Sequence, residues 1–251
     1  MPPQDFYDDL APFYHLVYED WEKSVERQAN DLHALIGQLA PGSETLLDVA
    51  CGIGTQALGL AGRGYRVSAA DLSPAAVERA RREAGTRGLS IELSVADMRQ
   101  AHRHRAAPFD LVLCGDNALP HLLTDTEILE ALRSFYRAVR PGGLCLLSVR
   151  DYEREDLSRR QLKPGGARDW DGARWLLWQV WEPRGRLYDL AMYLVEDRGA
   201  AECRTRVMRS TYYAIGTDRL IELMEEAGFV EARRLDGSFF QPLLVGLRPE
   251  A

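Results

Sequence analysis

The sequence lacks the features that three classes of protein need. Its only cysteines are Cys51, Cys114, Cys145 and Cys203, which form no CxxC pair and have no metal-ligand spacing. We therefore expect reduced thiols and no metal site. No apolar run approaches the ~18 residues that a membrane-spanning helix needs. The N-terminus, MPPQDFYDDL, has no apolar stretch of the signal-peptide type, so we expect a cytoplasmic protein without a membrane partner.

The sequence also lacks a basic stripe. It has 31 Lys and Arg against 38 Asp and Glu, a net charge of −7. Binding to nucleic acid depends on clustered basic residues, so we expect no nucleic-acid partner. The HRHR run at 102–105 is interpreted as a solvated loop, because neither a carboxylate nor a cysteine accompanies it.

Short apolar runs that alternate with helical segments indicate the fold. We expect strands at 45–50, 65–70, 91–96, 109–114 and 144–149, with helices between them. Such alternation predicts right-handed crossovers and a parallel, doubly wound α/β sheet. A helix at 217–227 and strands at 230–235 and 239–247 would complete a seven-stranded, Rossmann-like sheet.

Two further segments flank this sheet. Residues 1–44 have apolar side chains at helical spacing and are predicted to form a helical lid. Residues 151–215 contain three long aromatic stretches, at 174–181, 187–196 and 203–214, separated by turns. They predict an antiparallel β insertion that caps the substrate site. Residues 156–171 are polar and glycine-rich, so we expect a mobile loop there. The main domain would comprise 45–150 and 216–251.

The strongest motif is LLDVACGIG at 46–54. A strand that ends in Gly-x-Gly before a helix lets a ligand approach the backbone closely. Gly52, Gly54 and Ala57 also satisfy G-x-G-x-x-A, the dinucleotide fingerprint. The alternative is a tight turn with a purely structural role.

Two acids follow the next two strands. Asp71 is placed where doubly wound folds hydrogen-bond a ribose. Its structural alternative is a helix cap, a role that Ser73 fills better. Asp97 is placed to accept from an adenine amino group while Met98 packs on the ring, unless it is only a turn residue.

These motifs together carry a family resemblance. DVACGIG, AADLS, VADM, FDLVLC and RPGG, in this order, resemble the class I S-adenosylmethionine-dependent methyltransferases. The resemblance implies S-adenosylmethionine as the cofactor. It implies a cofactor site made of Arg27, Asp48, Ala50, Gly52, Gly54, Asp71, Leu72, Asp97, Met98 and Cys114. A nicotinamide-dependent oxidoreductase competes, but such an enzyme normally begins near its first strand.

A narrower resemblance concerns the methyl acceptor. GDNALPHL (115–122), VRDYE (149–153) and STYY (210–213) are similar to the glycine N-methyltransferase family of small-amine methyltransferases. The resemblance implies that Arg150 helps to hold a substrate carboxylate and that His121 lies near the substrate. Asp116 stands where that family has an asparagine. We therefore predict Asp116, His121 and Arg150 as the catalytic residues.

Several alternatives stay open. In a purely structural interpretation Arg150 pairs with Asp116 or Asp151. Independently, His121 is a core histidine or a helix-start residue. The acceptor is a small-molecule amine such as glycine or sarcosine, or else a sugar amine, or an oxygen or carbon atom of a secondary metabolite. A cofactor-binding regulator without catalysis is the alternative of another class. The aromatic strands of the insertion suggest a possible homo-oligomer.

Overall fold

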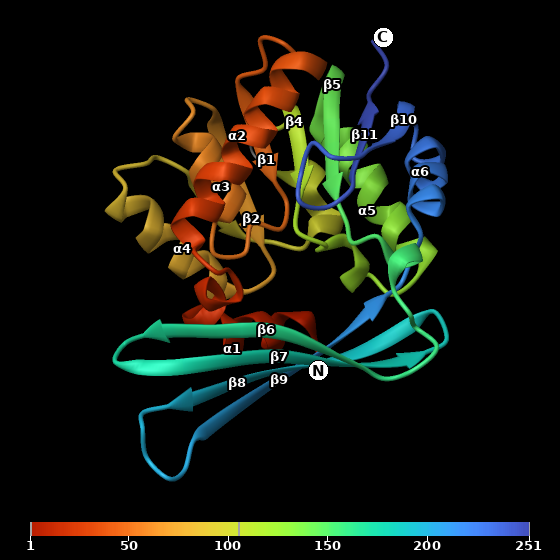
Figure 1. Cartoon of the computed structure of the whole chain (residues 1–251). Helices are drawn as coiled ribbons and strands as arrows, with labels where there is room; N and C mark the ends of the chain where they lie inside the picture. The colour runs from red at the N-terminus through yellow and green to blue at the C-terminus, as the bar shows by residue number, and fades with distance from the viewer. Residues whose placement is uncertain (1, 105, 251) are drawn as a thin grey trace.

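A seven-stranded sheet forms the centre of the chain in the computed structural model, which describes residues 2–104 and 106–250 (Figure 1). Its strand order is β10-β11-β5-β4-β1-β2-β3. The strands are β1 (Thr45–Asp48), β2 (Arg66–Asp71), β3 (Glu92–Val95), β4 (Phe109–Cys114), β5 (Val139–Ser148), β10 (Val230–Leu235) and β11 (Leu243–Leu247). Strands β1 to β5 pair in parallel, whereas β11 runs antiparallel to both neighbours. The predicted doubly wound sheet is confirmed.

Helices cover both faces of this sheet. On one face lie α2 (Trp21–Leu39), α3 (Thr55–Ala61) and α4 (Pro74–Thr86). The other face carries the short helix η2 (Met98–Arg103) with α5 (Asp125–Ala138) and α6 (Thr217–Glu226). Strand β4 shows why both faces are apolar: Leu111 and Leu113 pack on the first face, Val112 and Cys114 on the second. Alternate side chains of a strand point to opposite faces, so a sheet covered on both sides needs a continuous apolar run.

A second, antiparallel sheet lies beyond the carboxyl ends of the parallel strands (Figure 1), in the order β6-β7-β8-β9. It consists of β6 (Gln161–Trp170), β7 (Ala173–Arg184), β8 (Leu187–Asp197) and β9 (Arg204–Tyr213). The expected mobile loop at 156–171 is wrong, and the insertion has four strands rather than three. Backbone pairing with β7 overrides the polar composition, and Pro164 is tolerated because β6 is an edge strand with a register shift at that point.

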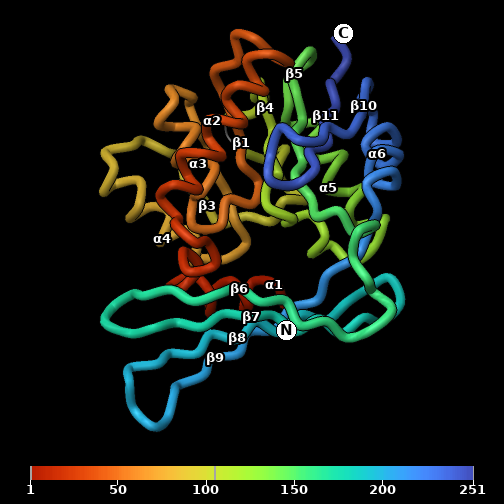
Figure 2. The backbone as a smooth tube through the Cα atoms, in the orientation of Figure 1, coloured from red at the N-terminus to blue at the C-terminus, as the bar shows by residue number. Residues whose placement is uncertain are grey.

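The N-terminal segment, residues 3–18, passes between the two sheets (Figure 2). It contains α1 (Pro3–Leu10) and the 3₁₀ helix η1 (Ala11–Val17). Phe6, Leu10 and Leu16 are buried together with Trp175 and Trp181 of the antiparallel sheet. The N-terminal segment therefore closes the space between the sheets.

Two single-turn helices are the remaining elements: η3 (Leu119–His121) follows β4 and η4 (Tyr152–Arg154) follows β5.

The described residues contain neither a candidate membrane-spanning helix nor a candidate metal cluster. Within 2–104 and 106–250, no helix combines the length and apolarity that crossing a bilayer requires. Over the same residues, no group of three or more His, Cys, Asp or Glu side chains is arranged to hold a metal ion.

Candidate active site

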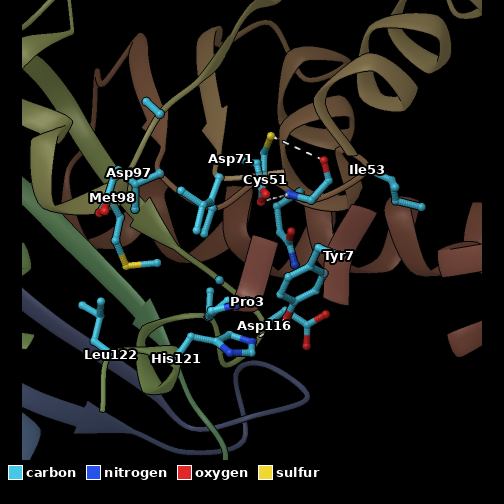
Figure 3. A pocket seen from close by; sticks show the side chains of 18 of the residues that line it. Pro3, Tyr7, Cys51, Ile53, Asp71, Asp97, Met98, Asp116, His121 and Leu122 are labelled. Carbon is cyan, nitrogen blue, oxygen red and sulfur yellow. Dashed lines mark hydrogen bonds between the residues drawn. The ribbon is translucent and has the colours of Figure 1, made fainter. Parts of the chain in front are cut away.

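A cavity of about 280 Å³ lies between the carboxyl ends of β1, β2, β3 and β4 and the N-terminal segment. Ligands of doubly wound sheets bind at this edge. Figure 3 shows Asp97 and Met98 at one side of the cavity, with Tyr7, Asp116 and His121 grouped at the other. The predicted site residues that line it are Ala50, Gly52, Asp71, Leu72, Asp97, Met98, Asp116 and His121.

The glycine turn presents bare backbone to the cavity. Gly52 has φ +53°, and a Cβ added there would lie 3.1 Å from the Tyr14 ring. Gly54, with φ +98°, caps α3 and faces Leu58, so it shapes the turn without lining the cavity. Both positions favour glycine because L-residues rarely adopt positive φ. A larger residue at 52 would take the space between the turn and Tyr14.

Asp48 lies behind this turn as a buried acid. Its Oδ1 accepts from the Ala50 backbone N–H at 3.2 Å, and its Oδ2 has no partner among the described residues. Burial, together with the nearby Asp71, raises the pKa of Asp48 to about 7. Asp48 does not line the cavity itself. Asp48 is therefore a buried acid behind the turn with one carboxylate oxygen that has no hydrogen-bond partner among the described residues.

Asp71 joins the turn to the next helix. Its Oδ2 accepts from the Gly52 N–H at 2.8 Å and its Oδ1 from the Ser73 N–H at 2.9 Å. Burial raises the pKa of Asp71, and these backbone bonds oppose the rise. Each carboxylate oxygen keeps a second lone pair, so the side chain can still accept from two hydroxyl groups. Its position fits a ribose.

Asp97 is held by a residue that the motif analysis missed. Arg99 donates to it from its backbone N–H at 2.8 Å and from its guanidinium at 2.6 Å, and reaches Glu127 at 3.3 Å. Burial alone would raise the pKa of Asp97, but the Arg99 bonds hold it below the usual value. Asp97 therefore stays a carboxylate beside the apolar side chain of Met98, an arrangement that fits a purine ring.

Three tyrosines form the wall that faces the glycine turn. Tyr7, Tyr14 and Tyr18 all come from the N-terminal segment and all line the cavity. Their rings follow one another at centroid distances of 5.8 and 6.4 Å. Burial raises the pKa of each phenol well above its usual value. Near neutral pH the wall therefore consists of neutral phenols and electron-rich ring faces, which attract cations.

Asp116 meets this wall from the end of β4. The Tyr18 hydroxyl donates to its Oδ2 at 2.9 Å. Asp116 and Asn117 both have positive φ. Ser148 holds them in this conformation: its hydroxyl accepts from the Asp116 N–H and its carbonyl from the Asn117 N–H. Such conformations cost of order 1–3 kcal/mol and concentrate at functional sites. Burial raises the pKa of Asp116, while the Tyr18 bond and the charge of Arg150 oppose the rise.

His121 is buried between the two sheets. Its Nε2 lies 2.9 Å from the Tyr7 hydroxyl and its Nδ1 lies 3.3 Å from the Ser210 hydroxyl. The ring also packs on Tyr212 at a centroid distance of 4.0 Å. Burial lowers the pKa of His121 to about 3. The imidazole is therefore neutral near pH 7, with one nitrogen as donor and the other as acceptor. Its hydrogen bond with the Tyr7 hydroxyl orients that side chain.

Arg150 does not line the main cavity. It lines two adjoining cavities, of about 270 and 690 Å³, and the larger one also contains Asp116 and Tyr18. Its guanidinium lies over the Trp181 ring at 4.3 Å. Among the described residues no carboxylate lies within salt-bridge distance of Arg150; Asp151 pairs with Arg234 instead. The structural ion pair considered for Arg150 is therefore wrong, and its charge faces the neighbouring cavities.

Besides Asp48 and Gly54, two further predicted cofactor residues do not line the cavity. Arg27 is exposed on α2 and outside the cavity, so its position does not support the predicted contact. Its neighbour Gln28 is the buried one and accepts from Gln56, which lines the cavity. Helical geometry turns adjacent residues by about 100°, so a one-residue error in spacing exchanges an inward residue for an outward one. Cys114 is buried in the apolar core and does not line the cavity.

Sequence analysis missed Tyr7, Tyr18 and Arg99 as lining residues. A signal existed for the tyrosines: positions 7, 14 and 18 have the spacing of one helical face. Nothing in the sequence places that face against β1. Arg99, two residues after Asp97, is detectable only as a possible local ion pair.

Part of the sequence is similar to known methyltransferases. Residues 46–143 match a family described as a methyltransferase domain. The glycine/sarcosine N-methyltransferase of Parasynechococcus marenigrum is 32% identical over 151 residues, which is 60% of this chain and 52% of that protein. A dTDP-3-amino-3,6-dideoxy-alpha-D-glucopyranose N,N-dimethyltransferase of Streptomyces fradiae is 33% identical over 146 residues, 58% of this chain and 55% of that protein. The chain thus spans about half the length of these curated relatives.

Solved structures match over nearly the whole chain. Streptomyces venezuelae DesVI gives a TM-score of 0.81 at 20% identity, covering 96% of this chain and 97% of that one. CalS10, an amino pentose methyltransferase of Micromonospora echinaspora, gives 0.79 at 23% identity, with 94% of each chain covered. At these identities the likeness establishes the fold, including the antiparallel sheet.

Proposed function

We propose that the chain, whose residues 46–143 match a methyltransferase domain, is a class I S-adenosylmethionine-dependent methyltransferase that methylates the neutral nitrogen of a small-molecule amine. The observation that carries the proposal is the division of one cavity into two chemically different ends. Bare glycine backbone and Asp71 mark one end, which we call the cofactor end. Asp116 and a tyrosine wall mark the other, which we call the acceptor end.

The residues of the first end fit an adenosyl group. Asp71 has lone pairs for the ribose hydroxyls, and Asp97 beside Met98 suits the adenine. The bare backbone at Gly52 suits the amino-acid part. S-adenosylmethionine supplies an activated methyl group on a sulfonium. The protein's own task is alignment, for which effective molarity can lower the barrier by ~7–11 kcal/mol.

The second end fits a nitrogen that becomes positive. An amine must be neutral when it attacks and carries a positive charge once it is methylated. The Asp116 carboxylate and the phenol oxygens of Tyr14 and Tyr18 stabilise that charge as it develops. The tyrosine ring faces add a cation–π contribution. His121 holds Tyr7 in this wall through their 2.9 Å contact.

We propose roles for the remaining segments on the same basis. Residues 1–44 would act as the lid, because Tyr7, Tyr14 and Tyr18 close the cavity from above. Residues 151–215 would act as the substrate cap, because Ser210 and Tyr212 contact His121. Arg150, whose charge faces the adjoining cavities, would hold an anionic part of the acceptor.

The test combines binding with turnover. Calorimetry with S-adenosylhomocysteine should give a measurable Kd, and the purified protein with labelled S-adenosylmethionine and an amine panel should give an N-methylated product by mass spectrometry. Absence of S-adenosylhomocysteine binding would overturn the cofactor assignment. Binding without any product on amine, alcohol and phenol panels would favour a regulator, whereas stabilisation by a nicotinamide nucleotide would favour an oxidoreductase.

A sugar amine is the second candidate acceptor beside glycine or sarcosine. The cavity of about 690 Å³ next to Asp116 favours it, because glycine needs far less room. The panel should therefore contain glycine, sarcosine and aminosugars side by side. Methylation of glycine with a higher kcat/KM than any aminosugar would reject the larger acceptor. Products methylated only at oxygen would reject the amine itself.

A further inference from the structure

One carboxylate fixes the first helix to α4. Asp8 lies on α1, and its Oδ1 accepts from the Ser73 hydroxyl at 2.5 Å and from the Ala75 backbone N–H at 3.1 Å. Ser73 is the N-cap of α4, whose first turn reads PAAV and contains no acid. The N-terminus of a helix favours a nearby negative charge. The N-terminal segment therefore supplies the charge that α4 lacks.

Ser73 links this carboxylate to the cofactor end of the cavity. While its hydroxyl donates to Asp8, its backbone N–H donates to Asp71 at 2.9 Å. Asp71 in turn accepts from the Gly52 N–H at 2.8 Å. A continuous chain of hydrogen bonds thus connects α1, the N-terminus of α4 and the glycine turn. Ser73 is completely buried, so water does not compete for these bonds.

The same helix places Tyr7 in the acceptor end. Tyr7 precedes Asp8, and its hydroxyl lies 2.9 Å from His121 and 3.4 Å from the Tyr212 hydroxyl. Adjacent residues of a helix point about 100° apart. Asp8 can therefore reach α4 while Tyr7 reaches the cavity. Since both belong to one short helix, a shift of Asp8 moves Tyr7 with it.

We propose that Asp8 is a positioning residue that couples the cofactor end of the cavity to the acceptor end, by docking α1 beside Asp71 and so setting Tyr7 in place. The inference rests on the proposed function, because it assumes that Asp71 holds the cofactor. It adds that cofactor affinity and acceptor affinity both depend on a carboxylate that touches neither molecule.

Other contacts keep the segment folded when Asp8 is changed. Arg79 donates to the backbone carbonyls of Ala11 and Pro12, both at 2.9 Å. Arg168 donates to the carbonyl of Tyr18 at 2.7 Å. These bonds hold η1 and the residues after it. Loss of the Asp8 carboxylate should therefore loosen α1 alone.

The experiment compares Asp8→Ala and Asp8→Asn with Asp9→Asn as the matched control. Asp9 is the exposed neighbour on the same helix, so its change removes the same charge without touching α4. Calorimetry measures the Kd for S-adenosylhomocysteine, hydrogen exchange follows residues 3–10, and steady-state kinetics separate KM from kcat.

We expect Asp8→Ala to weaken S-adenosylhomocysteine about tenfold, the effect of one hydrogen bond to a charged group. It should raise the KM of the acceptor more than it lowers kcat, and abolish the ligand-dependent protection of residues 3–10. Asp8→Asn should retain part of the affinity because an amide oxygen still accepts. If Asp8→Ala fails to fold, Asp8→Asn carries the test.

Two outcomes would overturn the inference while leaving the proposed function intact. One is wild-type Kd and wild-type protection of residues 3–10 in both Asp8 variants. The other is an equal loss of affinity in Asp9→Asn, which would assign the effect to net charge. If the wild-type protein itself does not bind S-adenosylhomocysteine, the proposed function fails instead.

Discussion

The two ends of the cavity are formed by different kinds of structural element. The cofactor end uses strand termini and backbone: Asp71 is the last residue of β2, while Gly52 and Asp97 follow the parallel strands β1 and β3. The acceptor end uses side chains from distant segments, such as Tyr7, Asp116 and Tyr212. An end made of strand termini is set by topology and tolerates changes elsewhere. An end made of converging side chains depends on the packing of three separate elements.

This contrast predicts that a change within one end should affect mainly that end, with the contacts of Asp8 as the proposed link between the two. Asp71→Ala should have the largest effect, because it removes a buried carboxylate and leaves the Gly52 and Ser73 N–H groups without their acceptor. We expect S-adenosylhomocysteine to bind about 100-fold more weakly, in line with two charge-assisted bonds. Calorimetry measures the change. An unchanged Kd would remove Asp71 from the cofactor site.

Asp116→Asn probes the acceptor end. The variant keeps the volume and the Tyr18 contact but removes the charge that faces the developing cation. We expect kcat to fall about 10–100-fold, the range for losing one electrostatic contact in a transition state. The Kd for S-adenosylhomocysteine should stay within twofold. A loss confined to cofactor binding would show that the two ends are not separate.

The raised pKa of Asp48 leads us to predict that the stability of the ligand-free protein depends on pH. Its pKa is about 7 in the folded, ligand-free chain and about 4 when unfolded. Between these values the folded state holds a proton that the unfolded state releases. The unfolded state therefore binds fewer protons, and the free energy of unfolding falls as pH rises from about 4 to 7. Asp48→Asn should lack this fall.

The measurement is thermal unfolding of both proteins across that pH range without ligand. We expect the Tm of Asp48→Asn to exceed that of the wild type by roughly 8–16 °C at the upper end of the range, because about three pH units at about 1.4 kcal/mol each correspond to about 4 kcal/mol. Parallel Tm curves for the two proteins would contradict the raised pKa.

Arg27→Ala should have the smallest effect. The side chain is exposed on α2, away from the cavity, so the Kd for S-adenosylhomocysteine should change less than twofold. Gln28→Ala is the matched comparison, because Gln28 is buried and bonds Gln56 in the cavity wall. A larger loss in Arg27→Ala than in Gln28→Ala would restore the contact implied by family resemblance.

The sequence was most informative at the cofactor end. Motif order predicted a methyltransferase domain and a doubly wound sheet. Residues 46–143 match a methyltransferase domain, and the sheet is confirmed. Asp71 and Asp97 were found because a parallel strand brings the residue after it to one known edge. The roles of these residues stay predictions. Arg27 lies outside the cavity, because a helix face changes with a shift of one residue.

The acceptor end was only partly predictable. Asp116 and His121 were identified through family resemblance, whereas Tyr7 and Tyr18 were missed and Arg150 lies in adjoining cavities. The fourth strand of the insertion, β6, was also missed, because its pairing partner rather than its composition makes it a strand.

By itself, then, the sequence determined the sheet, the order of its strands along the chain and the acids at their ends, since these follow from local periodicity and from the rules of parallel connections. Only the tertiary structure decided how residues 3–18 lie between the two sheets, and hence which tyrosines face Asp116. Contacts between segments about 100 residues apart, such as Tyr18 with Asp116, depend on how apolar faces pack against each other, and no local pattern encodes that choice.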